Sequence, residues 1–264
     1  MESARSAGCI YLASDLHLGA PDAASSRERE RRLVRWLEEV AGGTGCAEGA
    51  PADAIHLVGD VFDFWFEYRH AVPKGGVRLL GAIAQITDAG IPVHYHVGNH
   101  DLWTFGYLEE ELGVTVHRSP TAFEVGSHRV LIGHGDGLGP GDYGYKRLKR
   151  VFTQPFLQRC FRSVHPDWGI GLAMRWSRRS RANGEAPPDL QRPEEEWIWH
   201  ACKEAVTDDP TLAACFFGHR HHPMVLDVPV PRGGSIPYIN LGDWITHFTY
   251  GRFAAGRASL HTYP

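Results

Sequence analysis

Short apolar segments alternate with amphipathic ones along the first hundred residues. A short apolar run predicts a buried strand at 10–14, and two further strands are predicted at 55–58 and 93–97. Between the first two, apolar residues recur at helical spacing over 33–40, and the segment 77–89 predicts a helix that ends at Gly90. This strand–helix–strand–helix–strand order is typical of an α/β protein whose strands pair in parallel.

The second half of the chain has a different pattern. Residues 121–125 and 129–132 flank Gly126-Ser127 and predict a hairpin. Three later segments predict further strands, at 212–217, 237–241 and 246–253. Residues 143–205 carry amphipathic helical patterning without strand signals. We therefore expect a single domain, 1–264, that contains a helical insertion at 143–205.

Composition narrows the class of protein. The chain has 264 residues, 43% hydrophobic and 22% charged, with a formal net charge of -4, which excludes a disordered, collagen-like or coiled-coil chain. No apolar stretch approaches the roughly 20 residues needed to span a bilayer, and the N-terminus lacks the apolar core of a signal peptide. The five cysteines form no CxxC pair. We expect a cytoplasmic protein with reduced thiols.

Metal-compatible side chains follow five of the predicted strands, each close to a glycine. The five loops are Asp15-Leu16-His17, Gly59-Asp60, Gly98-Asn99-His100-Asp101, Gly133-His134-Gly135-Asp136 and Gly218-His219-Arg220-His221. Carboxylate, amide and imidazole ligands suit Mn, Fe, Zn or Co, whereas a structural zinc site would favour thiolates. One such histidine alone would more often be a core or surface residue. Five loops at strand ends favour a metal site instead, while His56, His94 and His96, inside predicted strands, favour structural roles.

In order, these loops read Asp-x-His, Gly-Asp-x-x-Asp, Gly-Asn-His-Asp, Gly-His-Gly-Asp and Gly-His-x-His. This set resembles the calcineurin-like metallophosphoesterase superfamily over residues 10–253, apart from the insertion. The resemblance implies a four-layer α/β/β/α sandwich with a dinuclear metal site at its edge. It also implies two divalent ions, for which we expect Mn²⁺, with Fe, Zn or Co as alternatives. Two such ions are a recurrent device for in-line hydrolysis at phosphorus.

The resemblance also assigns roles to individual residues. It implies that one metal is held by Asp15, His17, Asp60 and His221. It implies that the other is held by Asp60, Asn99, His134 and His219, so that Asp60 bridges the pair. His100 would lie beside the scissile phosphate, where it stabilises charge or protonates the leaving oxygen. Asp63 would orient the His100 imidazole, as carboxylates often do for functional histidines.

A closer resemblance is to the bacterial UDP-2,3-diacylglucosamine pyrophosphatase family of lipid A biosynthesis. It rests on the segments 14–19 (SDLHLG), 59–65 (GDVFDFW) and 134–138 (HGDGL), followed by an arginine-rich helical insertion. The protein Ser/Thr phosphatases differ, because they carry Arg-Gly where this chain has Phe64-Trp65. The resemblance implies hydrolysis of UDP-2,3-diacylglucosamine to UMP and 2,3-diacylglucosamine 1-phosphate. In that family the insertion caps the site and receives the acyl chains.

The insertion independently indicates an anionic, lipid-like ligand. From Lys146 to Arg181 there are ten Lys/Arg and one Asp/Glu, interleaved with apolar and aromatic residues. Such a face fits a phospholipid-like ligand or peripheral contact with the inner membrane of a Gram-negative-type bacterium, although a solvated helical face is the plainer alternative. No nucleic-acid partner is expected, because the basic patch is confined to the insertion. The predicted substrate contacts are Asp142, Tyr145, Arg178, Ser180 and Arg181.

Two other functions remain open at this stage. Well-known members of the pyrophosphatase family carry arginine where this chain has His100, which leaves room for a phosphoesterase acting on a different nucleotide or phospholipid phosphodiester. A non-catalytic interaction module is the alternative from another class. Such modules usually lose metal ligands, whereas all seven predicted ligand positions are kept here.

Overall fold

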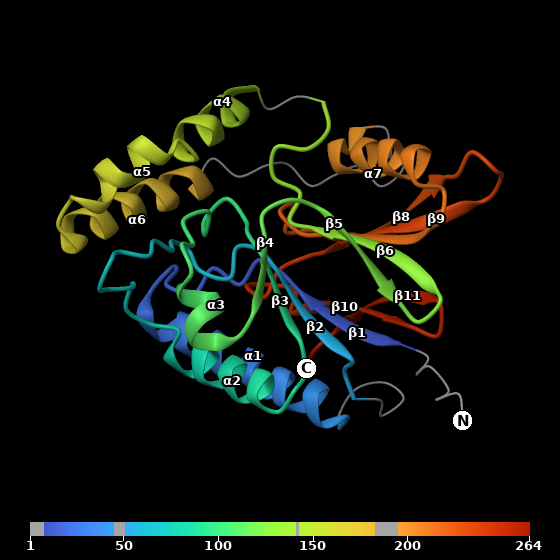
Figure 1. Ribbon diagram of the computed structural model, residues 1–264, viewed down its shortest axis with the longest axis horizontal. Helices are drawn as coiled ribbons and strands as arrows, with labels where there is room; N and C mark the ends of the chain where they lie inside the picture. The colour runs from blue at the N-terminus through green and yellow to red at the C-terminus, as the bar shows by residue number, and fades with distance from the viewer. Residues whose placement is uncertain (1–7, 45–50, 141–142, 183–194) are drawn as a thin grey trace.

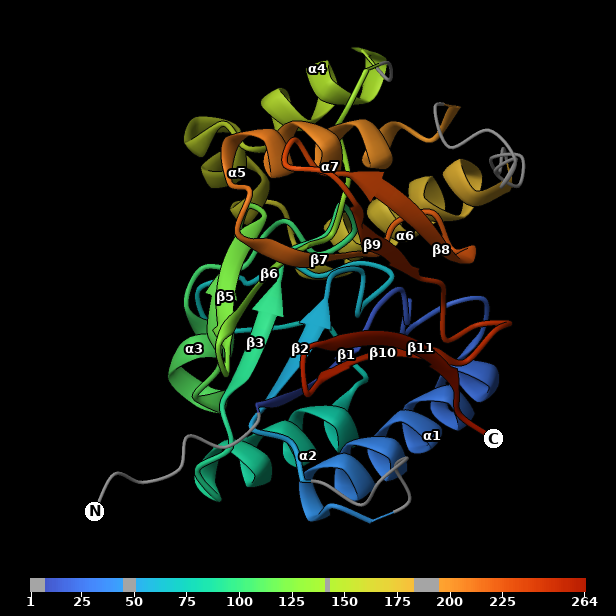
Figure 2. The same cartoon turned by 90° about the vertical axis from the view of Figure 1, so that its right-hand side faces the viewer.

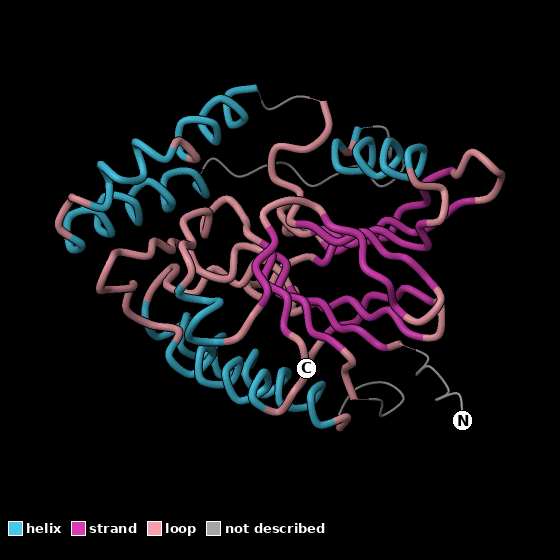
Figure 3. The backbone as a smooth tube through the Cα atoms, in the orientation of Figure 1, coloured by secondary structure: helices cyan, strands magenta, loops and turns pink. Residues whose placement is uncertain are grey.

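The computed structural model describes residues 8–44, 51–140, 143–182 and 195–264. Its strands form two sheets packed face to face between helices (Figures 1 and 3). The first sheet has six strands in the order β11 (Arg257–Thr262), β10 (Thr249–Ala254), β1 (Cys9–Ala13), β2 (Ala54–Val58), β3 (Val93–His96) and β4 (Thr115–His117). Within it, β1 to β4 are mutually parallel, so the loops that follow them leave the same edge.

The second sheet has five strands. Their order is β5 (Thr121–Val125), β6 (His128–Gly133), β7 (Leu212–Phe217), β9 (Ser235–Leu241) and β8 (Pro223–Pro229). The strands β6, β7 and β9 are parallel to one another. Both sheets therefore have a run of parallel strands from which functional loops can emerge together.

Helices cover the outer faces of the sheets and complete four layers. The first sheet is covered by α1 (Ala23–Gly42), α2 (Val77–Asp88) and α3 (Tyr107–Leu112), and the second by α7 (Trp197–Asp208) (Figures 1 and 2). The helix α1 begins where the Asp22 carboxylate accepts the backbone N–H groups of Ala24 and Ser25. The core between the sheets is aliphatic and aromatic; it includes Leu12, Val58, Ile132, Phe216, Leu241 and Phe253. The predicted α/β/β/α sandwich is confirmed.

The helical insertion forms a separate layer above the strand ends. It consists of α4 (Tyr143–Phe152), α5 (Pro155–Arg162) and α6 (Pro166–Ala182), which lie outside the two sheets (Figures 1 and 2). The predicted bounds, 143–205, also take in α7, but α7 packs Ile198 and Cys202 against the second sheet. We therefore propose that the insertion is α4–α6 and that α7 belongs to the sandwich. Across the described residues, no helix combines the length and apolarity needed to cross a bilayer.

The strand predictions differ from the structure at three edge strands and one boundary. The short or edge strands β4, β8 and β11 were not expected, because none carries a continuous apolar run. The strand predicted over 246–253 begins at Thr249. Its first residues form a turn instead, because Asp243 Oδ1 accepts the backbone N–H groups of Ile245, Thr246 and His247.

Candidate metal centre

The loops after β1, β2, β3, β6 and β7 bring the predicted ligands together at one edge of the sandwich. Three groups of side chains have potential ligand atoms that all lie within 4.8 Å of one another. The groups are Asp15/His17/His221, His17/Asp60/His100 and Asp60/His134/His219. Asp60 belongs to two of them, which is the arrangement that a bridging carboxylate requires. The loops come from both sheets, so the site exists only when the two sheets pack.

Backbone strain is concentrated at these loops. Five of the seven predicted ligands have positive φ angles, at 55° for Asp15, 44° for His17, 50° for Asp60, 70° for His219 and 56° for His221. Left-handed backbone at a non-glycine residue costs on the order of 1–3 kcal/mol and persists only where surrounding structure enforces it. Such strain is typical of functional sites, and here it aims the side chains inward.

The donor atoms face one another in a way that fits divalent cations. His17 Nε2 lies 3.2 Å from His221 Nε2, and His221 Nε2 lies 3.3 Å from Asp15 Oδ1. His134 Nε2 lies 3.2 Å from Asn99 Oδ1 and 3.3 Å from Asp60 Oδ2. Within the described part of the chain, Asp15 Oδ1 is buried without a hydrogen-bond partner. Lone pairs that converge in a buried space need a cation or proton between them, and this donor set suits two borderline divalent ions.

Neighbouring groups fix the orientation of several of these side chains. His134 Nδ1 lies 2.9 Å from the Val58 carbonyl oxygen; donation to that oxygen leaves Nε2 directed at Asn99 and Asp60. Asp15 Oδ2 accepts hydrogen bonds from the Ser14 hydroxyl and the His219 backbone N–H. Such outer contacts commonly set the tautomer and basicity of metal ligands.

Asp243 is a neighbour of the site that the sequence analysis did not assign. Its carboxylate lies 3.6 Å from His221 Nδ1 and 3.3 Å from His247 Nδ1. Burial opposes ionisation of Asp243, but the contacts with His221 and the backbone N–H groups of Thr246 and His247 outweigh it and lower its pKa. The signal was present in the sequence: Gly242-Asp243 follows a predicted strand, as Gly59-Asp60 does.

Burial and neighbouring charged groups shift the pKa values of the imidazoles. Burial lowers the pKa of His17 well below its usual value. Burial also lowers the pKa of His219 to about 4, and the neighbouring His134 acts on His219 in the same direction. At His221 burial lowers the pKa, but the nearby carboxylates of Asp15 and Asp243 outweigh it and raise the pKa to about 9. The raised pKa of His221 reflects the negative charge of the carboxylates around it, which is the charge that a divalent cation would also balance.

His100 lies beside the cluster and is held by the loop after β2. Its Nδ1 lies 2.9 Å from the backbone oxygen of Asp63 and 3.9 Å from Asp63 Oδ1. The Ser177 hydroxyl of α6 donates to Asp63 Oδ1 at 2.9 Å and lies 3.3 Å from His100 Nδ1. Asp63 thus meets the imidazole mainly through its carbonyl oxygen. Ser177 is a second residue that the sequence analysis missed, because only tertiary packing brings α6 to this loop.

Asp101 ties two of the ligand loops together. Its carboxylate accepts hydrogen bonds from the backbone N–H groups of Val61 and Gly98 and from the Tyr95 hydroxyl. Burial and the negative charge of Asp60 raise the pKa of Asp101 to about 6. The last residue of Gly-Asn-His-Asp therefore has a structural role, which is to hold the loops after β2 and β3 in register.

The predicted substrate contacts are only partly covered by the described residues. Tyr145 lines an apolar cavity beside Asn99 and His100, and its hydroxyl donates to Asp136 Oδ2 at 2.5 Å. Asp142 lies outside the described residues, as do the side chains of Arg178, Ser180 and Arg181.

Comparison with known proteins agrees with this site. A family model for the calcineurin-like phosphoesterases matches residues 10–223. This chain belongs to the calcineurin-like phosphoesterase family and is a metal-dependent hydrolase.

Individual relatives cover nearly the whole chain. The UDP-2,3-diacylglucosamine hydrolase of Porphyromonas gingivalis is 35% identical over 253 residues, covering 91% of this chain and 92% of that protein. The enzyme of the same name from Nitrosococcus oceani is 25% identical, and the match covers 89% of this chain and 86% of that protein. The one from Aeromonas hydrophila is 28% identical, and the match covers 88% of each chain.

Proposed function

We propose that this protein hydrolyses the pyrophosphate bond of UDP-2,3-diacylglucosamine to UMP and 2,3-diacylglucosamine 1-phosphate, a step of lipid A biosynthesis. The observation that carries the proposal is that a phosphoesterase site opens directly into an apolar cavity roofed by α4 and α6. The similarity to relatives named for this substrate supports it.

The apolar cavity is lined by residues of the candidate metal centre on one side and by apolar side chains on the others. Asn99 and His100 reach it from the site, and its other walls are mainly apolar, including Phe64, Leu102, Trp103, Leu148 and Phe152. Such a lining suits an acyl chain. The cavity measures about 130 Å³, less than the roughly 300–1,000 Å³ of most ligand sites. We therefore expect α4 and α6 to move apart when an acyl chain enters.

The proposed metal ligands come from the three groups of the site, with Asn99 added because its Oδ1 lies 3.2 Å from His134 Nε2 and with His100 assigned to the substrate instead. Asp15, His17, Asp60 and His221 would hold one ion, and Asp60, Asn99, His134 and His219 would hold the other. When bound, two such ions supply Lewis-acid activation of water and of the phosphoryl group. We propose Mn²⁺, because imidazole, amide and carboxylate donors without thiolate suit it.

His100 is proposed to assist the leaving group. Donation from Nδ1 to the Asp63 carbonyl leaves Nε2 as the nitrogen available to a substrate oxygen. Both ring nitrogens carry protons in the imidazolium form. In that form Nε2 would give its proton, or a hydrogen bond, to the departing oxygen as a general acid, while Nδ1 keeps its bond to Asp63. Tyr145 at the cavity wall, together with Asp142, Arg178, Ser180 and Arg181, is proposed to contact the substrate.

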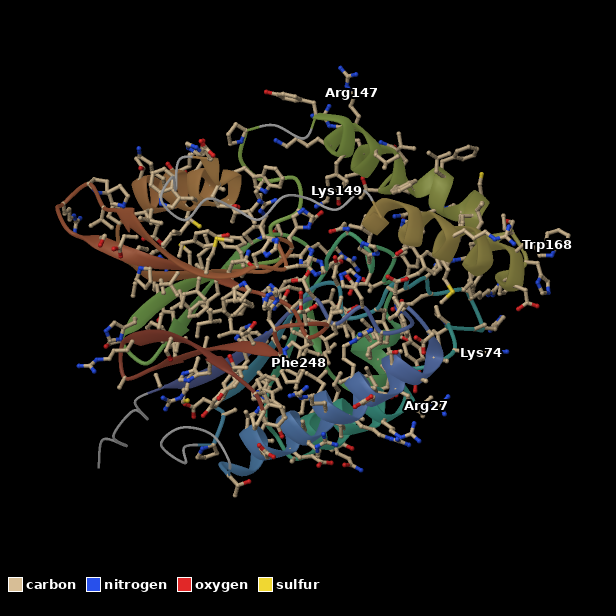
Figure 4. The ribbon with its side chains drawn as sticks, turned by 180° about the vertical axis from the view of Figure 1, so that it is seen from behind. Arg27, Lys74, Arg147, Lys149, Trp168 and Phe248 are labelled. Atoms are coloured by element: carbon tan, nitrogen blue, oxygen red, sulfur yellow. The ribbon has the colours of Figure 1, made fainter. Side chains whose placement is uncertain are left out.

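The outer face of the insertion is proposed to contact the cytoplasmic face of the membrane. Phe156, Trp168 and Leu172 are 71%, 77% and 66% exposed, and exposed Arg159 and Arg175 lie on the same helices. Figure 4 shows Trp168 at the far tip of this layer. An apolar, basic face of this kind binds anionic lipid surfaces.

A vesicle assay tests this membrane contact. Trp168→Ser and Phe156→Ser should reduce sedimentation with phosphatidylglycerol vesicles. Val77→Ser, at an equally exposed position on α2, is the matched control and should have no effect. Equal sedimentation of all three variants and the unmodified protein would exclude this surface.

Release of UMP tests the substrate. Purified protein incubated with Mn²⁺ and UDP-2,3-diacylglucosamine should produce UMP, and His134→Ala should abolish production. If no UMP forms at any metal loading, this substrate is wrong.

A second candidate, a phosphoesterase acting on another nucleotide or phospholipid phosphodiester, is favoured by His100 in place of the family's arginine. A panel of such esters separates the two, because preference for small soluble esters would support the second candidate. Metal analysis addresses a non-catalytic module, which predicts less than one equivalent of bound metal after reconstitution.

A further inference from the structure

A second cavity adjoins the metal centre from the opposite side of α4. It lies between the segment 117–120, the loop 134–138 and α4, and measures about 420 Å³, which is within the usual range for ligand sites. His134 lines this cavity, whereas Asn99 and His100 line the apolar one. The two cavities share no lining residue, so they approach the proposed metal pair independently.

The helix α4 divides the two cavities by its own amphipathic pattern. Tyr145, Leu148 and Phe152 line the apolar cavity. The other face of α4 lines the second cavity with Lys146, Lys149, Arg150 and Thr153. The spacing of three and four residues within each set places its members on one face of the helix. One helix therefore presents an apolar wall to one side of the site and a cationic wall to the other.

The second cavity is strongly basic in a protein whose net charge is negative. Arg118, Lys146, Lys149 and Arg150 line it, against the single carboxylate of Asp136. Asp136 Oδ2 pairs with Lys149 Nζ at 2.5 Å, so three further cationic side chains remain beyond that pair. Lysine and arginine carry several N–H donors each and recognise phosphate oxygens.

These cationic groups are also held in place. Lys146 Nζ donates to the Gly139 carbonyl and Arg118 donates to the Thr104 carbonyl, which leaves their other N–H groups for a ligand. Ser119 and His117 add neutral polar groups to the same walls. A phosphate beside a group with several hydrogen-bonding atoms, as in a nucleotide, matches this lining.

We propose that the second cavity binds the nucleoside monophosphate half of the substrate, on the side of α4 opposite the apolar cavity. The inference rests on the proposed function, because that substrate carries a polar nucleotide and an apolar acylated sugar on opposite sides of the scissile bond. The two cavities differ in the same way as the two halves of that substrate: one is lined by cationic and polar groups and the other by apolar ones.

Calorimetric binding of UMP to the metal-loaded protein tests the assignment. Lys146→Ala and Arg150→Ala should each weaken UMP binding by roughly tenfold, the expected effect of losing a charged hydrogen bond. Arg147→Ala is the matched control, because Arg147 lies on the same helix but points away from the body of the molecule, whereas Lys149 lies toward it (Figure 4). Metal content and the thermal unfolding midpoint of each variant establish that the fold and the metal centre are intact.

The outcomes separate this inference from the proposed function. Weakened UMP binding with unchanged binding of uridine and glucosamine 1-phosphate supports the cavity assignment, even if UDP-2,3-diacylglucosamine is not hydrolysed. Unchanged UMP binding in both variants overturns the assignment, even if that substrate is hydrolysed. A selective loss of glucosamine 1-phosphate binding overturns it as well, because the two halves would then be reversed.

Discussion

Ser177 of α6 donates a hydrogen bond of 2.9 Å to Asp63, and its oxygen lies 3.3 Å from the Nδ1 atom of His100. Ser177 is buried, so little solvent competes for these contacts. The insertion is thereby linked directly to the loop that orients His100. A shift of α6 on substrate binding would change the position of the imidazole.

Replacing Ser177 tests this link. Ser177→Ala should lower kcat about tenfold, less than the roughly 10²–10⁴-fold effect of removing a general acid. KM should change little, so that the loss falls on kcat and not on substrate binding. Ser177→Thr, which keeps the hydroxyl, should restore part of the rate. A purely structural role would instead lower the unfolding midpoint and raise KM together with the loss of kcat.

Asp60 is the residue on which both proposed metal sites depend. Asp60→Ala should reduce bound metal from two equivalents to one or none and abolish turnover, since a bridging carboxylate has no substitute in either group. Elemental analysis and UMP release provide the measurements. Chelator treatment of the unmodified protein should have the same effect on turnover, reversed by Mn²⁺. Full activity of Asp60→Ala would contradict the dinuclear mechanism.

Asp243 is expected to support metal binding from outside the ligand set. Asp243→Asn removes the charge that faces His221 Nδ1, and loss of such an outer partner typically costs about 10–100-fold in metal affinity. Competition with a chromophoric chelator would measure this. Asp227→Asn, on strand β8, is a control that should leave affinity unchanged.

A row of histidines crosses β2, β3 and β4 on the face toward β5. His56 Nδ1 lies 3.1 Å from His96 Nε2, and His94 Nδ1 lies 3.0 Å from His117 Nε2. All four rings contact Phe123. The structural roles expected for the strand histidines fit this packing, since each N···N contact is a hydrogen bond as long as at least one of its two rings is neutral and can accept.

Acid should destabilise the protein through this row. Burial lowers the pKa of His56 and His96 well below the usual 6.5, and lowers that of His94 to about 4. Below pH 6.5 the unfolded chain therefore binds more protons than the folded one. The free energy of unfolding then decreases as the pH is lowered, by at most about 1.4 kcal/mol per pH unit for each extra proton bound. Denaturant unfolding between pH 7 and 5 should show this loss.

A variant isolates the contribution of the histidine row. His56→Gln should flatten the pH dependence of the unfolding free energy, while the exposed His70→Gln should leave the slope unchanged. Equal slopes for His56→Gln and the unmodified protein would assign the acid sensitivity to other groups.

Local sequence was sufficient for the strands that lie in the middle of the sheets. The strands β1 and β7 are apolar throughout, and β2 and β3 are apolar apart from their histidines, because both faces of these strands are largely buried. The edge strands β8 and β11 were missed because one face of each meets solvent. The helix α7 was grouped with the insertion because an amphipathic pattern shows which face of a helix is buried, but not which part of the protein that face packs against.

The candidate chemistry could be read from the order of acid, amide and imidazole residues after successive strands, because parallel strands deliver their ends to one edge of a sheet. Which groups meet across the chain depends on tertiary packing and could not be read from local sequence. The contact of Ser177 with Asp63, the position of Asp243 beside His221 and the two cavities on either side of α4 all join residues far apart in sequence. Local periodicity carries no information about such pairs, since the packing of the two sheets and the insertion sets their distances.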